Sequence, residues 1–141
     1  MKILVPVDGS AYTKRMLAYL ATHDEWLGDS NTFTILHSVP PVPPRAAAVI
    51  DKGTLKSYYD DEAEKVFKPI RAFFGRKPAL KTSFVAKPGP AADNIAALAG
   101  KGDFDLIIMG SHGHGTLTNL VMGSVATKVL ANTNVPVLLV R

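Results

Sequence analysis

The chain has 141 residues, of which 47% are hydrophobic and 20% charged, and it contains no cysteine. This composition predicts one cytoplasmic domain spanning residues 1–141, and it excludes a disordered chain, disulfides and thiolate metal sites. The net charge is only +4, eight of the sixteen basic residues lie among carboxylates between Lys52 and Lys81, and no apolar run exceeds six residues. We therefore expect neither a nucleic-acid nor a membrane partner.

The amino-terminal third predicts two strands separated by a helix. Lys2–Val7 forms an apolar run that the turn residues Asp8-Gly9-Ser10 interrupt. The Ser10 hydroxyl is of the type that caps a following helix. Thr32–Val39 is the second strand, ended by four prolines between positions 40 and 44, and we expect a mobile loop from there to about Thr54.

The middle of the chain predicts a long amphipathic helix and then a third strand. The apolar positions of this helix recur at spacings of three and four: Ala63, Val66, Phe67, Ile70, Phe73 and Phe74. Pro69 lies inside the pattern and predicts a kink or an early break. The third strand is Leu80–Ala86, followed by a Pro-Gly-Pro turn.

The last third adds two helices and two strands. Ala92, Ile95 and Ala99 mark a short helix, Leu106–Met109 a strand that is apolar on both faces, and Val135–Val140 a final strand after another short helix. Five strands thus alternate with four helices along the chain. This order predicts an α/β fold with an open doubly wound five-stranded sheet and helices on both faces. Ligands of such sheets bind at the carboxyl ends of the strands where the strand order reverses.

A glycine-rich loop follows the fourth strand. It runs Gly110-Ser111-His112-Gly113-His114-Gly115 and reaches Gly123-Ser124 at the start of the last helix. Glycines permit close backbone approach, and a helix amino terminus attracts anions, so together they predict a phosphate cradle. The alternative is a flexible loop with an ordinary serine cap. The spacing matches neither a P-loop nor a dinucleotide fingerprint.

The titratable residues near these loops do not by themselves indicate a definite role. Asp8 is either a ligand of a nucleoside or metal, or a carboxylate that caps the next helix. His112 and His114 alone do not complete a zinc site, and no partner residue qualifies either one as a general base. No nucleophile elbow surrounds Ser10 or Ser111. We therefore predict no catalytic residue and no protein-held metal.

The segments around the loop extend the pattern over the whole chain. Gly110-x-x-Gly113, nine residues and Gly123-Ser124 resemble the motif of the ATP-binding branch of the universal stress protein family. Ile3–Ser10, Asp105–Gly110 and Pro136–Val140 are similar to the opening, fourth and closing strands of that family.

This resemblance implies a sheet of order 3-2-1-4-5, like that of adenine nucleotide alpha hydrolases, and a homodimer formed through the last strand, Val135–Val140. It implies ATP, with Mg²⁺ or Mn²⁺, as the ligand of a stress-response regulator. The implied contact residues are Pro6, Val7, Asp8, Val39, Met109, Gly110, Gly113, Gly123, Ser124, Val125 and Ala126. Within this set, Val39 and Met109 would meet the adenine. Ala126 stands where some members carry a hydroxyl.

Two other functions remain open on the sequence alone. A slow ATPase could use the same pocket, although no arginine finger or base is evident. A scaffold could instead bind another adenosine nucleotide such as cyclic AMP. Independently of the family, an exposed apolar edge at Val135–Val140 favours pairing with a second copy.

Overall fold

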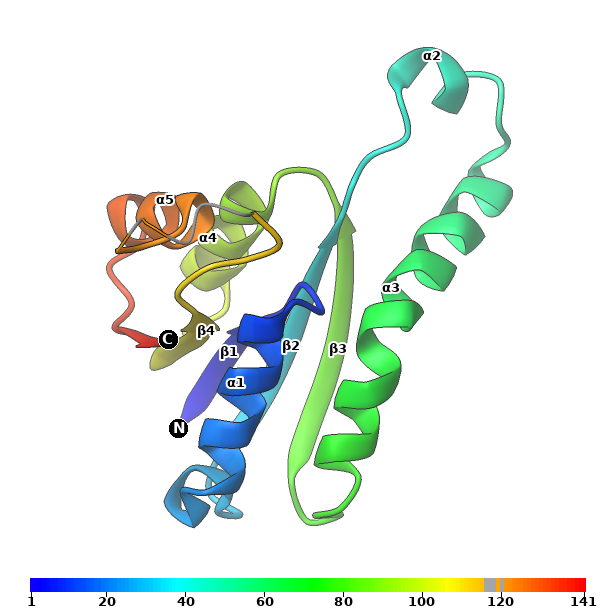
Figure 1. Ribbon diagram of the computed structural model, residues 1–141. Helices are drawn as coiled ribbons and strands as arrows, with labels where there is room; N and C mark the ends of the chain where they lie inside the picture. Colours follow the sequence, from blue (N-terminus) through cyan, green and yellow to red (C-terminus); the bar gives the residue numbers. More distant parts are fainter. Residues whose placement is uncertain (116–118, 120) are drawn as a thin grey trace.

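Five parallel strands form one sheet in the order β3-β2-β1-β4-β5 (Figure 1). The computed structural model describes residues 1–115, 119 and 121–141. Its strands are β1 Lys2–Pro6, β2 Thr32–Val39, β3 Lys81–Pro88, β4 Leu106–Gly110 and β5 Val137–Val140. Its helices are α1 Ala11–Ala21, the 3₁₀ turn η1 Asp24–Leu27, α2 Pro44–Ala47, α3 Lys52–Phe74, α4 Ala91–Lys101 and α5 Ser124–Asn132. The predicted doubly wound sheet and its strand order are confirmed.

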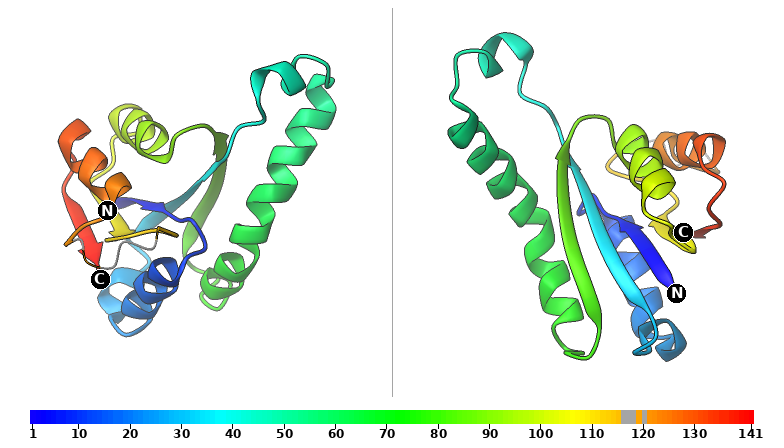
Figure 2. Two further views of the ribbon diagram at one scale, coloured as in Figure 1. Left: turned by 45° about the horizontal axis from the view of Figure 1, so that its top comes forward. Right: turned by 180° about the vertical axis from the view of Figure 1, so that it is seen from behind.

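Helices cover both faces of the sheet, as Figures 1 and 2 show. Alternate side chains of each strand point to opposite faces, so the core has two halves. Val5 of β1 and Ile35 of β2 pack with α1 and α3, whereas Leu4 and Leu36 pack with α4 and α5. All four of these side chains are at most 1% exposed.

The strand order reverses beside β1, and this reversal positions the functional site. The chain runs outward from β1 to β2 and β3 and then crosses back to β4, which pairs with the other side of β1. Loops leaving β1 and β4 in opposite directions open a space at their carboxyl ends.

Helix α3 departs from two expectations. It begins at Lys52 rather than after Thr54, and the short helix α2 occupies part of the predicted loop. It also continues through Pro69 to Phe74, so the predicted early break is wrong. Pro69 lies on the exposed side, while Phe67 and Ile70 beside it are buried against the sheet and keep the helix in place.

The first turns of α3 project past the sheet together with α2 (Figure 1). The Tyr59 hydroxyl accepts a hydrogen bond from the Val42 backbone N–H at 2.9 Å and so ties the proline-rich segment to α3. None of the helices in the described part of the chain has the length and apolarity needed to cross a membrane.

Replacing Phe67 by alanine should reduce the free energy of unfolding by about 3–5 kcal/mol, because it leaves a cavity between α3 and the sheet. The Phe67 ring packs on Phe84, with centroids 5.2 Å apart, and lies edge-on to His37. Urea unfolding should show a lower midpoint at unchanged slope. The exposed neighbour Lys68 is the control, since its alanine variant should change stability by less than about 0.5 kcal/mol. Equal effects of the two substitutions would contradict the assignment of Phe67 to the core.

The first turn of α3 should loosen in acid. Hydrogen bonds from the Thr54 hydroxyl and from the backbone N–H groups of Thr54 and Gly53 hold the pKa of the Asp51 carboxyl below its ordinary value of 3.8. A lowered folded-state pKa means that this stabilisation is complete above the unfolded value and disappears as pH falls through the folded one. Amide exchange at Gly53 and Thr54, corrected for intrinsic rates, should therefore accelerate near pH 3 relative to pH 5. An Asp51→Asn variant should lack this pH dependence.

Candidate functional site

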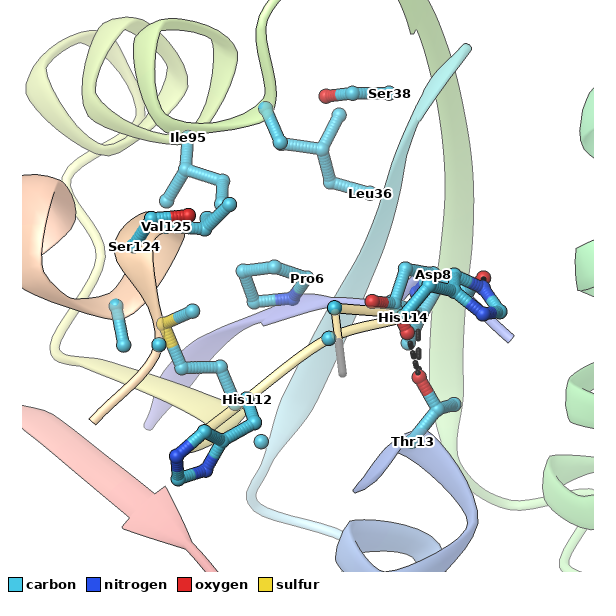
Figure 3. A pocket seen from close by; sticks show the side chains of 18 residues that line it. Pro6, Asp8, Thr13, Leu36, Ser38, Ile95, His112, His114, Ser124 and Val125 are labelled. Atoms are coloured by element: carbon cyan, nitrogen blue, oxygen red, sulfur yellow. Dashed lines mark hydrogen bonds between the residues drawn. The ribbon is translucent and has the colours of Figure 1, made fainter. Parts of the chain in front are cut away.

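A cavity of about 260 Å³ lies at the carboxyl ends of β1 and β4, between them and the amino terminus of α5 (Figure 3). Ten of the eleven residues expected at the site line it: Pro6, Val7, Asp8, Met109, Gly110, Gly113, Gly123, Ser124, Val125 and Ala126. Residues more than 100 positions apart in the sequence thus meet at the predicted switch point of the sheet.

The turn after β1 presents the Asp8 carboxylate. Its Oδ1 accepts hydrogen bonds from the Ser10 backbone N–H and the Thr13 hydroxyl, each at 2.9 Å, and Figure 3 draws the second of these. The Ser10 hydroxyl itself caps nothing and is buried without a partner among the described residues, so the predicted serine cap is wrong. Asp8 takes over the ordering of this turn and still lines the cavity.

Three glycines allow close packing around the loop that follows β4. A Cβ at Gly110 would lie 2.7 Å from the Tyr12 Cβ, and one at Gly113 would lie 2.6 Å from Asp8 Oδ2. A Cβ at Gly123 would lie 3.0 Å from both the Ser111 carbonyl oxygen and the His112 Cα. A side chain at any of the three positions would require its neighbours to shift: Tyr12 at Gly110, the end of the Asp8 side chain at Gly113, and the loop backbone at Gly123. In contrast, a Cβ at Gly115 would meet nothing within 4 Å.

The two loop histidines make different contacts. His114 Nε2 lies 2.6 Å from the Asp8 carbonyl oxygen; because a carbonyl only accepts, Nε2 carries the proton. This bond fastens the loop to the end of β1. The His112 ring packs on the Tyr12 ring, with centroids 4.9 Å apart, and its Nδ1 lies 2.8 Å from the Ser111 hydroxyl.

The amino terminus of α5 offers hydrogen-bond donors at the opposite wall. The Gly123 N–H donates to the Ser111 carbonyl at 2.7 Å, which joins the two ends of the loop. The first bond inside the helix runs from the Thr127 N–H to the Gly123 carbonyl. The N–H groups of Ser124, Val125 and Ala126 therefore have no intrahelical acceptor. With the helix dipole, they make this wall suited to an anion.

Val39 is the one expected residue that does not line the cavity. Its side chain is 1% exposed and packs in the core on the α3 face, and its carbonyl accepts the Gly89 N–H at 3.0 Å. The alternation of β2 turns Leu36 and Ser38 to the cavity instead. Sequence reasoning missed these two, although the period of two along β2 distinguishes them from Val39. It also missed Thr13, Ala91 and Ile95, which come from helices.

The charge of the lining limits its chemistry. None of the described residues around the cavity is a lysine or arginine, and Asp8 is the only carboxylate among them. No group of three or more His, Cys, Asp or Glu side chains gathers to hold a metal within residues 1–115, 119 and 121–141. The arrangement therefore suits a ligand whose anionic part is bound by backbone N–H groups and whose apolar part lies near Pro6, Leu36 and Ile95.

Solved structures share this fold over the whole chain. Universal stress protein UspA from Lactobacillus plantarum superposes with a TM-score of 0.79 at 21% identity, covering 100% of this chain and 97% of that one. The protein MJ0577 from Methanocaldococcus jannaschii superposes with a TM-score of 0.75 at 25% identity, covering 99% of this chain and 94% of that one.

Sequence comparison gives the family. A universal stress protein of Thermus aquaticus is 33% identical over 141 residues, which cover 99% of this chain and 97% of the relative. Universal stress protein Slr1230 of Synechocystis is 31% identical over 140 residues, and the match spans 42% of its length. The model described as the universal stress protein family matches residues 1–141. The chain belongs to the universal stress protein family.

Proposed function

We propose that this protein binds ATP, accompanied by Mg²⁺ or Mn²⁺, at the carboxyl ends of β1 and β4 and acts as a nucleotide-dependent regulator of a stress response. The observation that carries the proposal is the meeting of Gly110, Gly113 and Gly123 in one cavity with three backbone N–H groups that have no acceptor within α5. The cytoplasmic location and the protein's single-domain organisation over residues 1–141 belong to the same proposal.

The phosphates would occupy the side of the cavity formed by the glycine loop and α5. The N–H groups of Ser124, Val125 and Ala126 are directed along the helix axis, where they and the helix dipole favour negative charge. Ser124 is exposed and adds a hydroxyl donor, whereas Ala126 adds none. The lining supplies no lysine or arginine among its described residues, so a divalent cation would neutralise charge that the side chains leave uncompensated.

The nucleoside would occupy the side formed by β1 and β2. Asp8 Oδ1 is engaged by Ser10 and Thr13, which leaves Oδ2 to accept from a ribose hydroxyl. Leu36, Met109 and Ile95 offer apolar surface for a base. Relatives with TM-scores of 0.66 have been solved in complex with cAMP and with dAMP, which supports an adenine nucleotide as the ligand class.

Mg-ATP should bind the nucleotide-free protein with micromolar affinity, about −8 kcal/mol by calorimetric titration. Cyclic AMP should bind more weakly, because it cannot place a triphosphate chain on the α5 N–H groups. If the folded protein binds no nucleotide, the proposal fails. If it prefers cyclic AMP, the alternative of a scaffold for that nucleotide replaces ATP.

A methyl group at Gly113 should weaken ATP binding at least tenfold, because it must displace the Asp8 carboxylate from its position beside the loop. Gly100→Ala in α4 is the control, and it should change the affinity by less than about twofold, since Gly100 does not line the cavity and its Cβ would meet nothing within 4 Å among the described residues. Both variants must have a midpoint of thermal unfolding close to that of the parent protein. Equal affinities for the two folded variants would contradict the role given to the loop.

We also propose that the protein is a homodimer paired through β5. Among the strands that the structure describes, β5 pairs with β4 alone, and its four residues are half-buried in the single chain. Ile107 and Ser111 donate to the carbonyls of Pro136 and Val140. By the alternation of a parallel strand, the N–H groups of Val137 and Leu139 face the open edge. An unpaired apolar edge of this kind favours pairing with its own copy about a two-fold axis.

Sedimentation equilibrium should therefore give twice the chain mass of 15.1 kDa. Leu139→Pro removes one outward N–H and leaves in place the bonds that the Pro136 and Val140 carbonyls accept from Ile107 and Ser111, so it should shift the mass toward that of a monomer. The exposed α5 substitution Lys128→Ala should leave the dimer unchanged. A monomeric parent protein at about 100 μM would overturn this proposal, since a dimer with micromolar affinity would be nearly complete at that concentration.

A further inference from the structure

A polar pair outside the expected site residues lies at the end of the cavity remote from the glycine loop. Ser38 at the end of β2 lines the cavity, and Asn94 in the first turns of α4 lies beside it. Figure 3 shows Ser38 and Leu36 on the opposite side of the cavity from His112. Asn94 Nδ2 donates to Ser38 Oγ at 3.1 Å.

The surroundings of Asn94 determine which way its amide points. Nδ2 lies 3.3 Å from the Pro88 carbonyl oxygen and 3.5 Å from that of Lys87. Carbonyl oxygens only accept hydrogen bonds, so the amide nitrogen, not the amide oxygen, must face them. The same nitrogen therefore faces Ser38.

This orientation of the amide determines whether the Ser38 hydroxyl acts as a donor or an acceptor toward the cavity. A hydroxyl has one proton to donate and two lone pairs. Because Oγ accepts from Asn94, a lone pair is used on that side. No other hydrogen bond of the Ser38 hydroxyl is formed within the part of the chain that the structure describes, so its proton remains available to the cavity. The end of β2 thus presents a donor.

We propose that Ser38, oriented by Asn94, reads the base of the bound nucleotide by donating a hydrogen bond to an unprotonated ring nitrogen of a purine. This inference rests on the proposed nucleotide site. Leu36 and Ile95 beside Ser38 are apolar, which suits the faces of a flat heterocycle, and Ser38 supplies the polar contact that its edge requires. Asn94 is a positioning residue, since it acts through the hydroxyl.

The test compares ATP with its 1-deaza, 3-deaza and 7-deaza analogues, each of which replaces one ring nitrogen by C–H. Affinities are measured by calorimetry for the parent protein and for Ser38→Ala. ATP should bind the Ser38→Ala variant about fivefold to tenfold more weakly than the parent, in line with the loss of one hydrogen bond. One analogue should bind both proteins equally, and its missing nitrogen identifies the acceptor.

Ser83→Ala is the matched control. Ser83 lies on the neighbouring strand β3 and donates to the Thr34 hydroxyl at 3.2 Å, away from the cavity. Its alanine variant should keep the affinities of the parent for all four nucleotides. If the parent binds none of them, the proposed function fails. If the parent binds ATP but Ser38→Ala binds it equally well, or if all three analogues retain the effect of Ser38, only the present inference is overturned.

The role of Asn94 has its own readout. Asn94→Ala should reduce the preference for ATP over the analogue that lacks the acceptor nitrogen. It should leave the affinity for that analogue nearly unchanged. In a Ser38→Ala background, the same substitution should have no effect on this preference, which a double-mutant cycle measures as coupling. A uniform loss of affinity for every nucleotide would instead mean that Asn94 only holds α4 in place, and it would overturn the positioning role.

Discussion

The site depends on close packing around the loop after β4: the chain lies against α1 at Gly110 and against the turn after β1 at Gly113, and the two ends of the loop meet at Gly123. The tightest of these contacts is between Gly113 and the Asp8 carboxylate, where a Cβ would come within 2.6 Å. Close approach in turn allows His114 to bond the Asp8 carbonyl and Gly123 to bond the Ser111 carbonyl. The glycines are therefore required by the packing of the protein itself, in addition to any need to accommodate phosphate.

That packing is useful because of the sheet topology. Parallel strands bring the carboxyl ends of β1 and β4 together, and the reversal of strand order leaves room between the connections that follow them. Helix α5 then begins at the same place, and its first N–H groups have no acceptor within the helix. An anion bound at the proposed site would rely on backbone dipoles rather than on cationic side chains, since no lysine or arginine occurs among the described lining residues.

The sequence predicted the elements whose periodicity is unambiguous. The alternation of strands and helices predicted the fold class, and the glycine-rich loop after the fourth strand predicted the location of the site. It failed where tertiary contacts override local signals. Pro69 did not break α3, because buried residues on either side of it hold the helix against the sheet. Ser10 did not cap α1: its hydroxyl is buried without a partner among the described residues, while its own backbone N–H donates to the Asp8 carboxylate. Val39 was predicted to line the cavity, but the neighbouring residue Ser38 does so. No local pattern linked Ser38 to Asn94, which lies 56 residues away.

The bond between His114 and the Asp8 carbonyl also affects the thermodynamics of ligand capture. Because the protein's own contacts already hold this part of the loop beside β1, its conformational entropy is lost when the chain folds and not when a ligand arrives. Preorganisation of this kind favours fast association, which diffusion rather than loop closure would limit. It also couples affinity to local stability: warming that frees the loop from β1 would lower the population of binding-competent molecules while the sheet beneath it is still intact.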